Sequence, residues 1–346
     1  MSTSNNIIFP ERLRPGDVIA ITAPSSGVPL HLHPQLDEAI SHLRSRGYQV
    51  IEGKCLRAQY KNKSADKKLR AAELMSFLVD PAIKAIMPPW GGDLGMELLE
   101  LMDFDQLRQC QPKWFVGFSD LTTFQFPLTI LTGWATLHSP NLMQFGAESA
   151  DETTQGVWHI LEGERGTKVQ QEASSTFYYE GSHSGVKSIH PQTTEWKRLN
   201  LCTDEVCFQG RLIGGCLDII GRLAGTRFGN FPQFRDAQAS DGIILYLENV
   251  EMGPCELTRA LLSLRLQGWF TGLRGILIGR NAGPDISDST QLNYLDALQA
   301  VLGDLSVPVL YDVDIGHIPP QISLVNGAWA EVRFCEGRAS VIQQLA

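Results

Sequence analysis

The sequence predicts an α/β protein with two domains, each built on a sheet that contains parallel strands. Short apolar runs alternate with segments of helical apolar spacing along most of the chain. A length of 346 residues is more than one hydrophobic core usually supports. Glycine-rich turns follow several of the apolar runs, at positions where the strands of an α/β sheet would end.

The N-terminal half opens with a strand of the buried type and continues in β-α alternation. Leu36, Ile40 and Leu43 give the segment after the first strand its helical spacing. The expected strands are 17–24, 48–52, 83–87 and 114–116, and the expected helices are 34–46, 66–79, 96–102 and 120–131. Because parallel strands end at one edge of a sheet, we expect functional groups at that edge.

From about residue 148 the pattern loosens into a polar, turn-rich stretch, which predicts a crossover between domains. Alternation then returns, with a predicted turn at Gly214 and Gly215. The expected strands are 209–213, 243–247, 275–278 and 307–311, with short strands after Pro320, and the expected helices are 216–223, 255–266 and 291–302. The predicted units are an N-terminal α/β domain at 1–147, a linker at 148–208 and a C-terminal α/β domain with a β-rich end at 209–346.

Charge and hydropathy exclude several classes of protein. The 29 Lys and Arg residues are outnumbered by 38 Asp and Glu, giving a formal net charge of −9. Nucleic-acid binding needs a basic face to neutralise phosphates, and this balance does not provide one. No apolar stretch is long enough to span a membrane, and the N-terminus lacks the pattern of a signal peptide. We therefore expect a cytoplasmic protein without nucleic-acid or membrane partners.

The cysteines and histidines do not form a metal-binding pattern. Seven scattered cysteines fit reduced thiols better than a disulfide framework. The candidate ligand groups are Cys202 with Cys207, His183 and His190, and separately His31 with His33. The first group lacks the spacing of a zinc site, and the second has no cluster of histidines or carboxylates nearby. We expect no metal and no cofactor.

Residues 113–123 read KWFVGFSDLTT, the sequence form of a nucleophile elbow. In such an elbow a buried strand ends sharply, so that the hydroxyl of Ser119 would project from the sheet and the N–H of Asp120 would face the same space. The match is incomplete, because Leu121 stands where the G-x-S-x-G pattern has its second glycine. The alternative is an ordinary strand-to-helix turn in which Ser119 or Asp120 caps the helix.

A serine nucleophile needs a base, and the base needs an acid that orients it. Glu248 follows the apolar run IILYL, where a buried charge would require a partner. His317 lies in DVDIGHIPP after another apolar run. The two prolines that follow restrict the backbone, which would help to orient an imidazole. The alternatives are a loop carboxylate that caps the next helix and a structural histidine.

Gly91 and Gly92 in PPWGGD form a second glycine turn at a strand end. Such a turn can bring backbone N–H groups close to a substrate oxygen, although an ordinary tight turn is the alternative. Neither of the glycine motifs that bind nucleotide phosphates is present, so a nucleotide-dependent role is weakly supported.

Five segments in order resemble the serine peptidases of the LD-carboxypeptidase family, over nearly the whole chain. They are LRPGDVIAITAPSS, then PPWGGDLGMELLELMDFDQL with PKWFVGFSD, then GRLIGGCLDIIGRLAGT, then LYLENVEMGP, and finally VPVLYDVDIGHIPPQISLVNGAWAEV. The resemblance implies a triad of Ser119 as nucleophile, His317 as general base and Glu248 as orienting acid. It implies oxyanion donors in the N–H groups of Gly92 and Asp120.

The resemblance also implies an architecture and a substrate class. The N-terminal domain would resemble class I glutamine amidotransferases, the site would lie between the two domains, and the protein would form a homodimer. The implied substrate is a murein tetrapeptide ending in a D-amino acid, or a peptide-nucleotide amide. The PWGGDLG turn and Cys216, where murein-type members carry other residues, are more similar to the microcin-immunity branch.

Further residues are candidates for contacts with the substrate. Trp196 or the tyrosines at 178 and 179 could stack on a substrate ring, although packing is the alternative. Arg198 or Arg227 could pair with a substrate carboxylate, and Gly91 lies in the glycine turn. A different hypothesis is a non-catalytic small-molecule binding protein that uses the same cleft. A glutamine-amidotransferase-like hydrolase would instead require cysteine at position 119.

Overall fold

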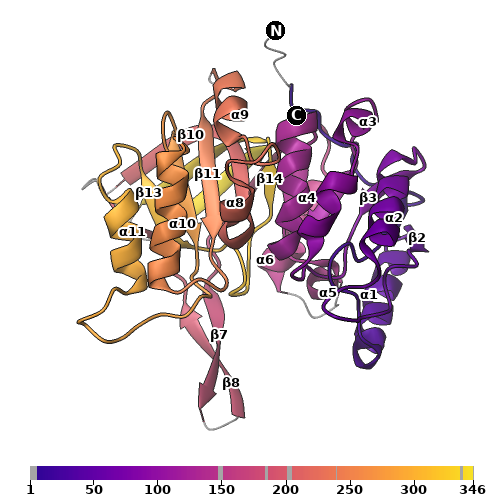
Figure 1. The fold of residues 1–346 in the computed structure, drawn as a ribbon, viewed down its shortest axis with the longest axis horizontal. Coiled ribbons are helices and arrows are strands. Elements are labelled where there is room, and N and C mark those ends of the chain that lie inside the picture. Colours follow the sequence, from indigo (N-terminus) through magenta and orange to yellow (C-terminus); the bar gives the residue numbers. More distant parts are fainter. Residues whose placement is uncertain are drawn as a thin grey trace.

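The structure, a computed structural model, describes residues 6–146, 151–183, 186–200, 205–238, 240–335 and 338–345. Its N-terminal and C-terminal halves each form a sheet covered by helices, and the two halves lie side by side (Figure 1). This confirms the predicted α/β class and the β-rich end of the chain. Within the described ranges, no helix is long and apolar enough to cross a membrane.

The first sheet has six strands in the order β14-β5-β4-β3-β1-β2. Its strands are β1 (Val18–Ile21), β2 (Gln49–Glu52), β3 (Ile83–Ile86), β4 (Trp114–Gly117), β5 (Thr136–His138) and β14 (Leu324–Asn326). Neighbouring strands from β2 to β5 pair in parallel, and only β14 is antiparallel, to β5. The carboxyl ends of β3 and β4 therefore bring the glycine turn and the serine turn to one edge.

Helices cover both faces of this sheet. They are α1 (His33–Ser45), α2 (Lys67–Val79), α3 (Phe104–Arg108), α4 (Thr122–Pro127), α5 (Leu142–Phe145), α6 (Glu152–Gln155) and α7 (Val157–Leu161). The predicted helix at 96–102 is a 3-10 helix over Gly95–Leu101. The helix predicted at 120–131 is a 3-10 turn, α4 and a π-turn in succession. Phe126 and Ile130 from this segment pack into the core of the second half, so α4 lies between the halves.

The second sheet has eight strands in the order β6-β16-β15-β10-β11-β12-β13-β9. Its strands are β6 (Lys168–Glu172), β9 (Lys197–Arg198), β10 (Glu205–Cys216), β11 (Ile243–Glu248), β12 (Gly275–Gly279), β13 (Val309–Val313), β15 (Trp329–Cys335) and β16 (Arg338–Gln344). Strands β10 to β13 are parallel, and the outer strands are antiparallel. The helices of this half are α8 (Leu217–Leu223), α9 (Phe231–Ala237), α10 (Pro254–Leu266) and α11 (Tyr294–Leu302).

Gly214 and Gly215 were expected in a turn, but they continue strand β10. They pair with Tyr246 and Leu247 of β11. A side chain at position 214 would place its Cβ 1.8 Å from the carbonyl oxygen of Tyr246, and one at position 215 would meet Thr122. The glycines therefore allow close packing inside a strand, which a short-range turn rule does not anticipate.

The predicted crossover segment contains strands that join the second sheet. β6 pairs with β16, and β9 pairs with β13. β6 shows strict alternation of exposed and buried residues, as expected for a half-buried antiparallel strand, although its sequence is polar. β7 (Thr176–His183) and β8 (Val186–Thr193) form a separate hairpin that projects from the body of the molecule (Figure 1).

Strand β14 crosses from the second half of the chain into the first sheet. It lies beside β5, and its last residue, Asn326, is fully buried. The side-chain oxygen of Asn326 accepts hydrogen bonds from the Gly214 N–H and the Tyr246 hydroxyl, and its amide group donates to Thr136. One buried amide therefore connects the two sheets.

Candidate active site

Ser119 lies on a sharp turn directly after β4. Its φ of 67° is in the left-handed region that serine rarely adopts. Gly117 makes the turn possible, because with φ of 135° its Cβ would lie 2.4 Å from both Asn141 and Leu121. The N–H of Phe118 donates to Oδ1 of Asn141 over 3.1 Å, which anchors the turn from outside. This is the strand-turn-helix context expected of an elbow.

The structure brings Ser119, His317 and Glu248 together from three separate parts of the chain. The Oγ of Ser119 lies 3.0 Å from Nε2 of His317. The Nδ1 of the same imidazole lies 2.9 Å from Oε2 of Glu248. Glu248 ends β11, and His317 follows β13 in the loop that leads to β14. Three sequence-predicted residues thus form a continuous line of hydrogen bonds.

The charges of this group depend on one another. Burial alone would raise the pKa of Glu248, but the charge of His317 and its hydrogen bond outweigh burial and lower it. Burial alone would lower the pKa of His317, but the charge of Glu248 and the hydrogen bond outweigh burial and raise it. The pair therefore favours a carboxylate beside an imidazole that takes up a proton readily.

The predicted glycine turn packs directly against the elbow. A Cβ on Gly91 would lie 3.0 Å from both the Oγ of Ser119 and the N of Asp120. Gly92 is exposed and has φ of 140°, a conformation for which glycine is needed. Gly91 thus packs against Ser119 and the N of Asp120, and Gly92 packs against Ser25 and Ser26.

The side chain of Asp120, which the sequence suggested only as a possible helix cap, holds the loop after the glycine turn. Its buried carboxylate accepts from the Ser25 hydroxyl over 2.5 Å, the Gly95 N–H over 2.7 Å and the Thr123 hydroxyl over 3.1 Å. Burial nevertheless raises its pKa. A carboxylate after the elbow serine was visible in the sequence, but its distant partners were not.

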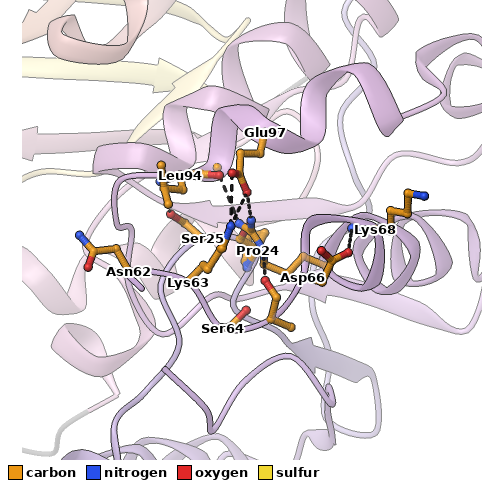
Figure 2. Close-up of polar contacts among 12 residues, drawn as sticks. Pro24, Ser25, Asn62, Lys63, Ser64, Asp66, Lys68, Leu94 and Glu97 are labelled. Atoms are coloured by element: carbon orange, nitrogen blue, oxygen red, sulfur yellow. Dashed lines mark hydrogen bonds and ion pairs between the residues drawn. The ribbon is translucent and has the colours of Figure 1, made fainter. Parts of the chain in front are cut away.

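A buried arginine fastens the same loops from the other side. Arg70 is fully buried and donates to the carbonyls of Pro24 over 2.8 Å and Leu94 over 3.2 Å, and it forms an ion pair with Glu97. Figure 2 shows Pro24, Leu94 and Glu97 gathered in this cluster, where Lys63 also forms an ion pair with Glu97. The turn that carries Gly91 and Gly92 is therefore held by ionic contacts outside the site.

Another residue missed by sequence reasoning lies beneath the site. His138 ends β5, is fully buried and packs edge-on against Tyr246 with ring centroids 5.2 Å apart. Burial lowers its pKa to about 4, so the ring is neutral near pH 7. Phe118 packs between the two imidazoles, 6.0 Å from His138 and 4.6 Å from His317.

The other predicted contact residues make contacts with other parts of the chain. Trp196 is only 1% exposed and donates its Nε1–H to Asp314 over 2.6 Å, which supports packing, the alternative to substrate stacking. Arg198 lies in edge strand β9 opposite Leu310. Arg227 is exposed and lies over the ring of Phe228 at 4.6 Å. Tyr178 is 41% exposed on β7.

The histidine and cysteine groups show no metal geometry in the part of the chain that the structure describes. The Nε2 of His33 lies 3.0 Å from the Val28 carbonyl and 3.1 Å from the Arg57 carbonyl, which makes it a structural histidine. Cys202 lies outside the described residues, as do the side chains at 179, 183 and 190.

Both halves of the chain match domains of one known family. Residues 19–139 match the LD-carboxypeptidase N-terminal domain, and residues 209–332 match the LD-carboxypeptidase C-terminal domain. The protein belongs to the LD-carboxypeptidase family. The N-terminal match contains Ser119 and the glycine turn, and the C-terminal match contains Glu248 and His317.

LD-carboxypeptidase relatives match almost the full chain. A Vibrio cholerae protein provisionally named a carboxypeptidase is 28% identical, covering 95% of this chain and 96% of its own. A Bacillus subtilis protein provisionally named a murein peptide carboxypeptidase is 26% identical, covering 96% and 93%. The microcin C7 self-immunity protein MccF of Escherichia coli is 24% identical, covering 95% and 94%.

Solved structures of LD-carboxypeptidase-like proteins share the fold. An MccF-like protein from Bacillus anthracis has a TM-score of 0.81 at 22% identity, covering 98% of this chain and 100% of its own. MccF in complex with glutamyl sulfamoyl guanosine also has a TM-score of 0.81 at 22% identity, covering 97% and 98%. A muramoyltetrapeptide carboxypeptidase from Oxalobacter formigenes has a TM-score of 0.72 at 22% identity, covering 94% of this chain and 98% of its own.

Proposed function

We propose that this protein is a serine-type LD-carboxypeptidase whose nucleophile is Ser119. The observation that carries the proposal is the line of contacts from Ser119 through His317 to Glu248, at 3.0 and 2.9 Å. A hydroxyl, an imidazole and a buried carboxylate in this order form the arrangement that activates serine for attack on a carbonyl. Membership of a carboxypeptidase family supports an amide as the bond that is cleaved.

The proposed reaction proceeds through an acyl-enzyme. Ser119 Oγ attacks the amide carbonyl while His317 Nε2 takes the hydroxyl proton, and Glu248 stabilises the resulting imidazolium. The N–H groups of Gly92 and Asp120 donate to the oxyanion. The imidazolium then protonates the amine as the C–N bond breaks. Water, deprotonated by His317, attacks the ester in the second half of the reaction and releases Ser119.

We propose two substrate classes for this chemistry. One is a murein tetrapeptide, cleaved between an L-centre and its terminal D-amino acid, as the names of two relatives suggest. The other is an amide of a peptide-nucleotide, because MccF has been solved with an aminoacyl sulfamoyl nucleoside. The homodimer implied by the resemblance and the cytoplasmic location expected from the sequence stay predictions.

Mass spectrometry of products formed in H₂¹⁸O tests the reaction and the substrate together. A panel of LD-peptides, their LL-isomers and aminoacyl sulfamoyl adenosines would be incubated with the wild type and with Ser119→Ala. We expect amine release and one ¹⁸O in the new carboxylate, for at least one substrate, only with the wild type. Saturable binding without turnover by the wild type would instead support the alternative, a non-catalytic small-molecule binding protein.

A further inference from the structure

The loop that carries His317 is held from below by Arg280. The guanidinium is 3% exposed and donates through Nη2 to the Ile318 carbonyl over 3.1 Å. It also donates to the Pro320 carbonyl. These are the first and third residues after His317, so Arg280 fixes the backbone on which the imidazole is mounted.

Arg280 is held in turn by Asp314. Its Nη1 lies 2.6 Å from Oδ1 of Asp314, and the aspartate side chain is completely buried. The remaining acceptor capacity of Asp314 is used by the Trp196 indole N–H over 2.6 Å, the Ser174 N–H over 3.2 Å and the Ser174 hydroxyl. A buried ion pair is costly unless further hydrogen bonds satisfy it, and here they come from a different segment of the chain.

That segment is the root of the β7–β8 hairpin. Ser174 precedes β7 and Trp196 follows β8, so Asp314 receives hydrogen bonds from both ends of the hairpin. The Phe177 ring lies 5.0 Å from the Arg280 guanidinium, and the Tyr178 N–H donates to the Pro319 carbonyl over 2.9 Å. The hairpin itself projects from the body of the molecule (Figure 1).

We propose that Arg280 and Asp314 are positioning residues for His317, and that Trp196 aims the imidazole through them. The inference rests on the proposed function, in which His317 is the general base. In this inference Trp196, a candidate for substrate stacking from the sequence, serves instead to align the base. Because a misplacement of about 1 Å can cost about 100-fold in rate, a loosened His317 loop should lower turnover more than substrate binding.

The decisive variant is Trp196→Phe, which keeps an aromatic ring but removes the donor to Asp314. Trp269→Phe is the matched control, because Trp269 is also fully buried in the second half but stacks on Phe231, with centroids 4.6 Å apart. We expect Trp196→Phe to lower kcat about tenfold with little change in KM, as for loss of a hydrogen bond to a charged group. The control should change neither.

The titration of the His317 imidazole by NMR gives a readout that does not require turnover. Glu248, Asp218 and Glu251 all raise the pKa of His317, and the neighbouring His138 is also within its electrostatic reach. If Trp196→Phe loosens the loop, the contact with Glu248 weakens and the pKa of His317 falls. Ser174→Ala should also lower the pKa of His317, and it replaces Trp196→Phe in this test if that variant does not fold.

The outcomes separate this inference from the proposed function. A folded Trp196→Phe with wild-type kcat and wild-type His317 titration would overturn the inference, as would an equal loss in Trp269→Phe. Full turnover by Ser119→Ala would instead overturn the proposed function, while the NMR titration would still report whether the Trp196 contact positions His317.

Discussion

Ser119 occupies a backbone conformation that costs a non-glycine residue about 1–3 kcal/mol. Packing against the neighbouring residues holds the backbone in this conformation. Gly117 fits against Asn141 and Leu121 without a side chain, and Gly91 fits against Ser119 itself. The same strain aims the hydroxyl at His317, so local distortion and chemical competence have a common cause.

At the same scale, the pH dependence should follow His317. Its raised pKa means that the neutral base forms only above the ordinary titration range of histidine, so kcat/KM should rise with pH through that raised value. Glu248→Gln should lower the pKa of His317 and reduce kcat by about 10⁴-fold, since the imidazolium loses its carboxylate. Rate profiles and NMR titration measure both effects.

The control for this prediction is Glu251→Gln. Glu251 is exposed and affects the pKa of His317 less than Glu248 does. It should leave kcat within about twofold of the wild type, because a solvated charge is screened. Wild-type turnover by Glu248→Gln would contradict the role given to this carboxylate.

The packing of Gly91 against Ser119 can be tested by adding a single methyl group at position 91. Gly91→Ala would place its Cβ 2.9 Å from the Cβ of Ser119 and 3.0 Å from the N of Asp120. We expect kcat to fall at least about 100-fold, because loss of one oxyanion donor alone costs this much. Gly253→Ala is the control, since a Cβ there meets nothing within 4 Å and its φ is −69°. Equal activities in a substrate-hydrolysis assay would refute the packing argument.

At the scale of elements, Gly214 allows strand β10 to pack closely against β11. Gly214→Ala would force a Cβ to 1.8 Å from the Tyr246 carbonyl oxygen, so β10 and β11 would have to separate. We expect a loss of more than about 3 kcal/mol in the free energy of unfolding. Urea denaturation measures it.

A second glycine substitution should act with the opposite sign. Gly221 lies inside α8, where a Cβ would only touch that of Ala260 at 3.8 Å. Gly221→Ala should therefore raise the free energy of unfolding by about 0.5–1 kcal/mol, as alanine does in a helix. If both alanines had the same effect, the close β10–β11 approach would not be what selects glycine at 214.

The sequence was a good guide where local pattern decides structure. The alternation of strands and helices, the elbow around Ser119 and the strand-end positions of Glu248 and His317 all follow from short-range signals. The continuation of β10 through Gly214 did not, because it depends on the neighbouring strand. The partner of Trp196 did not either, because Asp314 lies 118 residues away.

On the scale of the whole molecule, the predicted boundary at residue 147 can be tested directly. The sheet of the N-terminal half takes its edge strand β14 from residues 324–326, and Asn326 bonds to Thr136. A fragment of residues 1–147 would leave the β5 edge unpaired, and exposed edges promote aggregation. We expect no cooperative thermal transition for this fragment by circular dichroism. A sharp transition with native-like ellipticity would show that the N-terminal half folds alone.

In the proposed mechanism both halves of the chain are needed. The N-terminal half contributes Ser119 and the proposed oxyanion donors, and the C-terminal half contributes His317 and Glu248, which contact Ser119 and one another in turn. Cys216 joins the two halves beside the site, where its N–H donates to Thr122 over 3.1 Å. The relative position of the two sheets therefore sets the distance between nucleophile and base.

The most direct test is the turnover of Ser119→Ala on the substrate that the wild type cleaves best. Ser41→Ala is the control, because Ser41 is an exposed serine on α1. We predict that kcat of Ser119→Ala falls by at least about 10⁴-fold while Ser41→Ala keeps wild-type activity. Turnover by Ser119→Ala within tenfold of the wild type would contradict the assignment of Ser119 as the nucleophile.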